Sequence, residues 1–115
     1  MKLLWKITIV LFAGVHVATA QINKDDISVV QFSAQFVKAN EMSLAIFSNY
    51  NTQTLYMEDH QKLFAREKIK SLPTIILYSD GEVIYKIDGG ISMELPEDCA
   101  SEIQDYIDEI LRSRF

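Results

Sequence analysis

The chain contains a single cysteine, at position 99, and this limits the thiol chemistry that it can perform. Exchange between a dithiol and a disulfide needs a nucleophilic thiolate and a second thiol that resolves the mixed disulfide. One sulfur supports neither an intrachain disulfide nor a cysteine-based metal cluster. Cys99 falls on the apolar face of an expected C-terminal helix, one turn before Ile103, where a buried and inert thiol is the commoner case. A lone thiol that forms mixed disulfides is the alternative.

The histidine and the acidic clusters do not have the spacing of a metal site. His60 stands at an expected helix start, with no cysteine and no second histidine near it in the sequence. Asp105, Asp108 and Glu109 lie close together, but on a regular helix they lack the loop geometry and carbonyl ligands of a calcium site. We therefore expect a solvated acidic face, and we expect no metal, no cofactor and no catalytic residue.

The first 20 residues have the composition of a secretory signal peptide. Lys2 and Lys6 mark a short basic start, an uncharged and mostly apolar run follows over residues 7–17, and residues 18–20 (Ala-Thr-Ala) give the small-x-small pattern of a cleavage site. A membrane anchor is the alternative, but a helix needs about 20 apolar residues to cross a bilayer, and this run is shorter. We expect cleavage after residue 20 and no membrane association afterwards.

The remaining residues, 21–115, are enough for one small domain with a single core. They keep all sixteen acids and nine of the eleven bases, so their net charge is near −7 (9 − 16). That charge disfavours nucleic acid and anionic membranes as partners. The chain has no Asn-x-Ser/Thr glycosylation site and does not end in a retrieval signal of the Lys-Asp-Glu-Leu type. We expect a secreted, extracellular protein, with the lumen of the endoplasmic reticulum as the alternative.

Apolar periodicity and turn residues divide this domain into short elements. Asp80-Gly81 between two apolar runs is the strongest signal, because this pair tolerates the positive φ angles of a two-residue hairpin turn. The last helix is amphipathic, with apolar residues three or four positions apart between Cys99 and Leu111. The expected elements are strands at 27–30, 44–47, 54–57, 74–79 and 82–87, helices at 32–40 and 60–68, a polar loop at 48–53, and the C-terminal helix.

The segment from Leu63 to Thr74, continued through the hairpin to Gly89, resembles the C-terminal half of the thioredoxin family. In that family a helix leads to an Ile-x-x-(apolar)-Pro-Thr segment, which is followed by a hairpin with a glycine turn and by a terminal helix. The resemblance covers about half of residues 21–115 and keeps the order and spacing of these elements. It implies an α/β fold, the three-layer thioredoxin-like sandwich.

The same resemblance makes Leu72, Pro73 and Thr74 candidates for peptide binding. In the family this proline is cis, lies beside the cysteine pair and helps to hold extended polypeptide substrates. A purely structural turn is the simpler interpretation of Pro73 here, because the cysteines are absent.

The redox motif of the family has no counterpart in this sequence. Ser48, Asn49, Tyr50 and Asn51 follow the expected strand at 44–47, which is where we place the family's Cys-x-x-Cys, and none of them is a cysteine. Dithiol chemistry is therefore not expected at this position.

The sequence also leaves too little room for the helix that follows the cysteines in the family. This helix carries the chain from one strand to a parallel neighbour, and a parallel crossover needs about a dozen residues. Only a few residues separate the strands expected at 44–47 and 54–57. The sandwich is therefore expected to be incomplete. Either the crossover helix is missing and one face of the sheet is half covered, or these two strands form a hairpin.

These observations favour a secretory-pathway protein without redox-active cysteines that binds another protein or a peptide, or associates with itself. An apolar strip left open by the missing helix would be the contact surface, because such strips are usually buried by a partner. The first alternative is a protein-disulfide reductase or isomerase that acts through Cys99. The second is a shortened, marginally stable relative of a redox-active thioredoxin.

Overall fold

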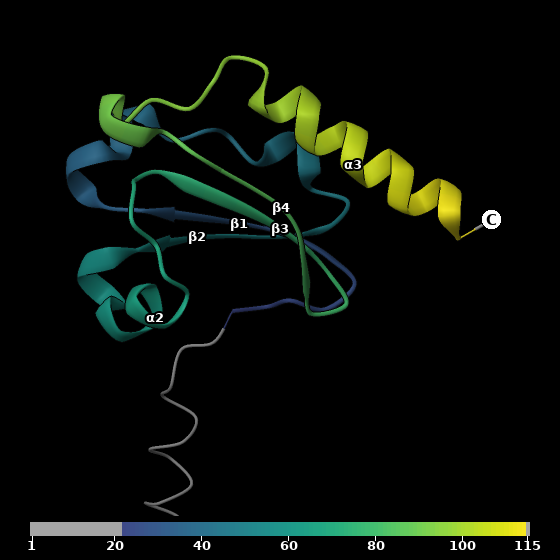
Figure 1. The fold of residues 1–115 in the computed structure, drawn as a ribbon, viewed down its shortest axis with the longest axis horizontal. Coiled ribbons are helices and arrows are strands. Elements are labelled where there is room, and N and C mark those ends of the chain that lie inside the picture. The colour runs from purple at the N-terminus through teal and green to yellow at the C-terminus, as the bar shows by residue number, and fades with distance from the viewer. Residues whose placement is uncertain (1–21, 115) are drawn as a thin grey trace, which may run out of the picture.

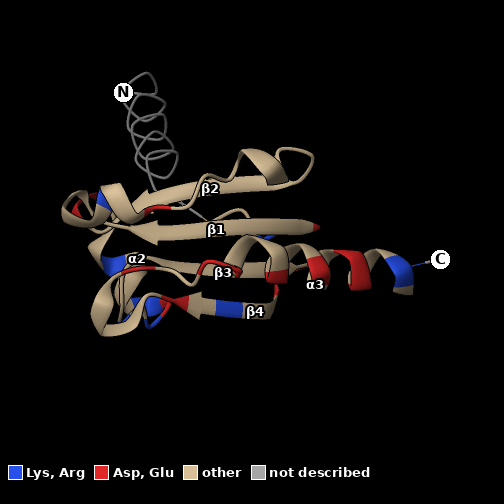
Figure 2. Cartoon of the chain, turned by 90° about the horizontal axis from the view of Figure 1, so that it is seen from above, with Lys and Arg blue, Asp and Glu red and all other residues tan. Residues whose placement is uncertain are grey.

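The computed structural model describes residues 22–114, and the expected signal peptide lies outside this range. Four strands form one mixed sheet in the order β2-β1-β3-β4 (Figure 1). Their bounds are β1 Ile27–Ser33, β2 Asn51–Tyr56, β3 Thr74–Ser79 and β4 Glu82–Asp88. β1 and β3 are central, and β2 and β4 form the two edges (Figure 2).

The connections between the strands determine their directions. β1 and β2 run parallel, and residues 34–50 between them are long enough for such a crossover. β3 runs antiparallel to both β1 and β4. Asp80 and Gly81 join β3 to β4 with φ angles of 50° and 89°, the positive values that a two-residue hairpin turn needs. The hairpin expected from Asp80-Gly81 is thus confirmed.

Two α-helices and four short 3-10 helices complete the described chain. α3 is amphipathic, as expected, and turns Cys99, Ile103 and Ile107 into the core. Tyr85 of β4 donates a hydrogen bond to Glu102 of this helix, which fixes α3 against the sheet. The helices are α2 Gln61–Arg66 and α3 Cys99–Ser113, and the 3-10 helices are η1 Gln35–Asn40, η2 Ala45–Phe47, η3 Met57–Asp59 and η4 Gly90–Ser92. In residues 22–114 no helix is long and apolar enough to cross a bilayer.

The sheet has a core on each face, because successive side chains of β1 alternate between the two sides. Ile27 and Val29 pack on the same side as α3, whereas Val30 and Phe32 pack with Phe64 of α2 on the other side. Every residue of β1 is buried, and so is every residue of β3 before Ser79. The expected uncovered apolar strip is therefore absent from the two central strands.

The expected strand at 44–47 is wrong, and so is the hairpin that it would form. Residues 45–47 form η2, and β2 pairs in parallel with β1 instead. The crossover of residues 34–50 contains 3-10 helices and no α-helix. It still covers the sheet, because Phe47 is fully buried in the α3-side core, whereas Ile46 is 60% exposed.

The first strand is longer than expected, and the helix after it is shorter. β1 continues past Val30 to Ser33, because the polar side chain of Gln31 is satisfied inside the protein. Gln31 Nε2 donates to the carbonyl of Met42 at 2.9 Å, and the Met42 N–H donates to Gln31 Oε1 at 2.8 Å. The expected helix at 32–40 is reduced to η1.

Candidate functional site

Four chain segments meet at the end of the sheet where β1, β2 and β4 end and β3 begins. The last residues of β1 and β2 lie opposite one another, and Thr74 at the start of β3 lies opposite Phe32 and Asp88. We call this end of the sheet the Pro73 end, after the residue that precedes β3. η1, η4 and α2 surround it (Figure 1).

Leu72, Pro73 and Thr74 are held in place mainly by backbone contacts. The Leu72–Pro73 peptide bond is cis, and the carbonyl of Pro73 accepts a hydrogen bond from the Gly89 N–H at 3.0 Å. Thr74 Oγ1 donates to the carbonyl of Ser71 at 2.5 Å. Pro73 and Thr74 are buried, and Leu72 is half-buried against the α2-side core. Of the three sequence candidates, Leu72 is the one that reaches the surface.

The loop after β4 brings two apolar side chains to the Pro73 end. Gly89 leaves no room for a side chain, since a Cβ there would lie 2.8 Å from the backbone nitrogen of Glu94. The chain turns sharply through η4, with a left-handed φ of 60° at Met93. Ile91 is fully exposed and Met93 is 43% exposed.

η1 lies directly beside this loop. Asn40 Nδ2 donates to the carbonyl of Met93 at 2.8 Å, which joins the end of η1 to the loop. The start of η1 is fixed by the Glu58 carboxylate, whose two oxygens accept the Gln35 N–H at 2.9 and 3.1 Å. Between these two anchors, η1 buries Val37 and leaves Phe36 65% exposed.

Two adjacent segments of the Pro73 end therefore carry exposed apolar side chains. We call Phe36, Ile91 and Met93 the apolar rim. Leu72 adds a half-buried side chain at the turn into β3. Exposed apolar groups that lie together on a surface are typical of a place where another chain binds.

A carboxylate joins η1 to the ends of β1 and β2. The two oxygens of Glu41 accept hydrogen bonds from Ser33 Oγ at 2.8 Å and from the Tyr56 hydroxyl at 3.2 Å. The bond to Glu41 is the main reason that the pKa of Tyr56 lies above its usual value. Lys38 lies over the Tyr56 ring, 5.9 Å from its centre. The Tyr56 phenol thus stays protonated, and its hydrogen bond to Glu41 holds the C-terminal end of η1 in place.

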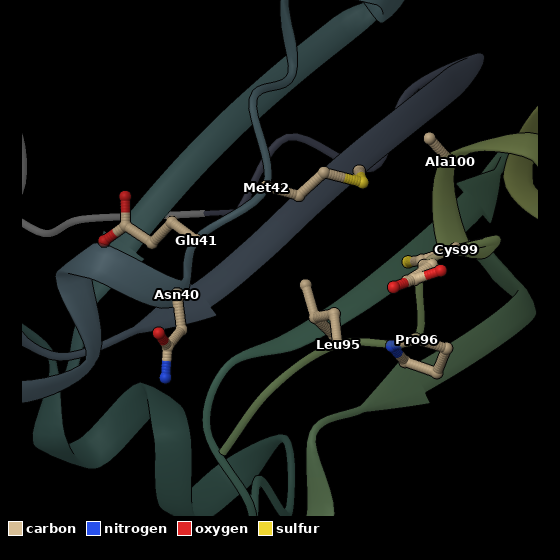
Figure 3. A pocket seen from close by; sticks show the side chains of 8 residues that line it. Asn40, Glu41, Met42, Leu95, Pro96, Cys99 and Ala100 are labelled. Carbon is tan, nitrogen blue, oxygen red and sulfur yellow. The ribbon is translucent and has the colours of Figure 1, made fainter. Parts of the chain in front are cut away.

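A pocket of about 230 Å³ opens beside Asn40, between the crossover and the start of α3. The Met42 side chain extends from the crossover toward Ala100 of α3, and the Glu41 carboxylate points away from that helix (Figure 3). The residues that line it are Asn40, Glu41, Met42, Leu95, Pro96, Glu97, Cys99 and Ala100.

The thiol of Cys99 borders this pocket but is chemically protected. Cys99 is 2% exposed. Burial raises the pKa of its thiol to about 11, and the nearby charges of Glu102 and Asp98 add to the shift. The reactive form of cysteine is the thiolate, so this thiol is a poor nucleophile near neutral pH. No three histidine, cysteine, aspartate or glutamate side chains within residues 22–114 come together as a metal site.

Ser48, Asn49, Tyr50 and Asn51 do not lie with the Pro73 end. They form the last part of the crossover, and Asn51 begins β2 opposite Ser28 at the start of β1. The structure therefore places them at the other end of the sheet from Leu72, Pro73 and Thr74. The crossover between parallel neighbours starts after β1, at η1, rather than after residues 44–47.

The residues of the apolar rim were not found from the sequence. Phe36 lies within the helix that was expected at 32–40, and Ile91 and Met93 follow Gly89-Gly90 in a segment without periodicity. One signal in the sequence could have indicated this arrangement. If the run from Ile27 to Ser33 is interpreted as one strand, the crossover begins directly after it, at η1.

The structural comparisons give the same fold in several thioredoxins. No protein-family model and no curated protein matches the chain. Thioredoxin NaTrxh from Nicotiana alata is similar over 75% of this chain and 76% of its own, with 17% identity and a TM-score of 0.57. An N21Q mutant thioredoxin from Halobacterium salinarum covers 71% of this chain and 75% of its own, with 20% identity and a TM-score of 0.54.

Thioredoxin from Plasmodium falciparum is similar to the same degree. It covers 73% of this chain and 74% of its own, with 21% identity and a TM-score of 0.54. This chain forms a mixed four-stranded sheet with helices and is smaller than a full thioredoxin. It contains a single cysteine, whereas a redox motif needs two. It therefore has a thioredoxin-like α/β fold without a cysteine pair.

Proposed function

We propose that this chain is a redox-inactive thioredoxin-like protein of the secretory pathway that binds an extended segment of another protein at the Pro73 end. The observation that carries the proposal is the apolar rim, Phe36, Ile91 and Met93, exposed on two segments that the Asn40–Met93 hydrogen bond holds together. The signal-like composition of residues 1–20 supports export, or residence in the endoplasmic reticulum.

The start of the crossover supports a binding role rather than a catalytic one. In the thioredoxin family the cysteines open the helix that carries the chain to its parallel neighbour. In this chain the segment that begins that connection is η1, with Phe36 exposed and Val37 buried. We therefore assign the position of the lost motif to η1 instead of Ser48 to Asn51. An apolar contact stands here in place of a pair of thiols.

The turn into β3 supplies the other side of the binding surface. Pro73 and Thr74 are buried and keep the turn in shape, while Leu72 contributes its partly exposed side chain. An extended segment lying between Leu72 and the apolar rim would bury apolar surface at about 25 cal/mol for each Å² removed from water. Reduction or isomerisation of disulfides through Cys99 is disfavoured, because the thiol is buried and its pKa is raised to about 11.

Replacing two of the three side chains of the apolar rim is expected to weaken binding to an unfolded chain at least about tenfold, because a few central side chains carry most of the affinity of such contacts. The change is the double substitution Phe36→Ser and Ile91→Ser. The probe is reduced, carboxymethylated α-lactalbumin, an unfolded polypeptide without free thiols, and its binding is measured by fluorescence anisotropy.

Val83→Ser is the matched control, because Val83 is 58% exposed and lies at the far end of β4 from Pro73. The control should bind like the wild-type protein. Equal affinity of the rim variant and the control, or no binding by the wild-type protein, would refute a peptide site at the Pro73 end. Thermal melts of each variant exclude loss of the fold as the cause.

A further inference from the structure

The outer side of β2 has no strand beside it in residues 22–114. β2 is the first strand in the sheet order, so one side of its backbone pairs with β1 and the other side faces away from the sheet (Figure 2). An edge of this kind presents unpaired N–H and C=O groups, and another extended chain can pair with them.

The two edges of the sheet differ in how they are protected. β4 carries Glu82, Lys86 and Asp88, and its pairing with β3 is irregular between Leu77 and Tyr78. Charges and irregular pairing are common ways of preventing one sheet from joining another. β2, with the sequence Asn-Thr-Gln-Thr-Leu-Tyr, has no charged residue and no proline. The β2 edge is therefore the one open to strand pairing.

One hydrogen bond shows which backbone groups of β2 face outward. The Asp80 N–H donates to the Asp26 carbonyl at 2.9 Å, so in the antiparallel β1–β3 pair the even-numbered residues of β1 bond to β3 and the odd-numbered ones turn toward β2. Val29 lies opposite Thr52 in the parallel β1–β2 pair. Residues 51, 53 and 55 therefore bond to β1, and the backbone groups of residues 52, 54 and 56 point away from the sheet.

We propose that the outer edge of β2 pairs with the β2 edge of a second copy of this chain, antiparallel, with the two Thr54 residues facing each other on a two-fold axis. In this register Thr52 of each copy lies opposite Tyr56 of the other. The outward residues then form three pairs with two backbone hydrogen bonds each, six in all. Two four-stranded sheets become one continuous sheet.

The edge suits a second copy because it is symmetric about its own centre. Thr54 is the middle one of the three outward residues, so a two-fold axis through it satisfies every outward N–H and C=O group. If the two-fold axis is moved by one residue along the strand, only two hydrogen-bonded pairs form instead of three. The strand brings no charge to the interface, although the chain is acidic, and Thr–Thr contacts are among the cross-strand pairs that stabilise sheets.

Cysteine cross-linking tests the register directly. The protein is produced from the full-length sequence, with Thr54→Cys and Thr52→Cys as matched variants, and is oxidised under mild conditions. In an antiparallel hydrogen-bonded pair the Cα atoms are about 5.5 Å apart, within the range of a disulfide. The two residues at position 52 would be displaced by about 13 Å along the strands. Thr54→Cys is therefore expected to form covalent dimers at least about tenfold faster, although Thr52 is the more exposed side chain.

Sedimentation of the protein without added cysteines gives a second readout. The wild-type protein should show a concentration-dependent dimer, and Thr52→Pro should raise its dissociation constant at least about tenfold, because it removes two of the six hydrogen bonds. A proline is tolerated there, since the N–H of Thr52 does not bond to β1. A wild-type monomer at every concentration, equal cross-linking of the two cysteine variants, or binding of a synthetic peptide of residues 51–56 to a protein that stays monomeric would overturn the proposal.

Discussion

Replacing Phe47 by alanine is expected to lower the free energy of unfolding by about 3–5 kcal/mol. The Phe47 ring is fully buried in the α3-side core, next to residues from β1, β3 and α3. Its removal takes apolar surface out of the core and leaves a cavity that the surrounding strands cannot close. The loss is measured by urea unfolding followed by circular dichroism.

The neighbouring residue supplies the control for this prediction. Ile46 is 60% exposed on the other side of the same 3-10 turn, so Ile46→Ala should change stability by no more than about 0.5 kcal/mol. Similar losses for the two variants would mean that η2 does not present a single side chain to the core, and the description of the crossover would then be wrong.

Replacing Gln31 by leucine is expected to cost about 2–4 kcal/mol, although leucine is the more hydrophobic residue. The Gln31 side chain pairs with both backbone groups of Met42 inside the protein. Leucine fills a similar volume but leaves the Met42 N–H and C=O without their partners. The crossover would then be held less firmly against the sheet, which can be measured as faster amide hydrogen exchange at Met42.

Gln104→Leu is the matched substitution, because Gln104 Nε2 donates to the Asp108 carboxylate at 2.9 Å in an exposed position on α3. Its expected cost is about 0.5 kcal/mol or less. If Gln31→Leu were as mild as Gln104→Leu, the pairing with Met42 would not be what allows β1 to continue through a polar residue.

The parts of the fold that were predicted correctly depend on local chemistry. The β3–β4 hairpin follows from the two residues of its turn, and α3 follows from the apolar period between Cys99 and Leu111. The crossover was mispredicted because its structure depends on contacts across the chain. A polar residue such as Gln31 predicts the end of a strand, because the sequence does not show that Met42 pairs with its side chain. The apolar run 44–47 has the pattern of a buried strand when it is considered alone.

The candidate site was predicted in part for the same reason. Leu72, Pro73 and Thr74 were identified from a resemblance in sequence, and the structure places them at the end of the sheet where the apolar rim lies. The rim combines η1 with the loop after β4, and these segments are joined by a hydrogen bond between residues 53 positions apart in the sequence. Ser48 to Asn51 were assigned to the redox position because they follow the strand expected at 44–47, and the structure has η2 there instead of a strand.

Turnover of insulin disulfides in the presence of dithiothreitol tests the central claim most directly. The account predicts that the purified protein leaves the rate of insulin reduction at the level of dithiothreitol alone, and that Cys99→Ala makes no difference, because the single thiol is buried and protonated. A rate comparable to that of an ordinary dithiol thioredoxin, lost on Cys99→Ala, would contradict it.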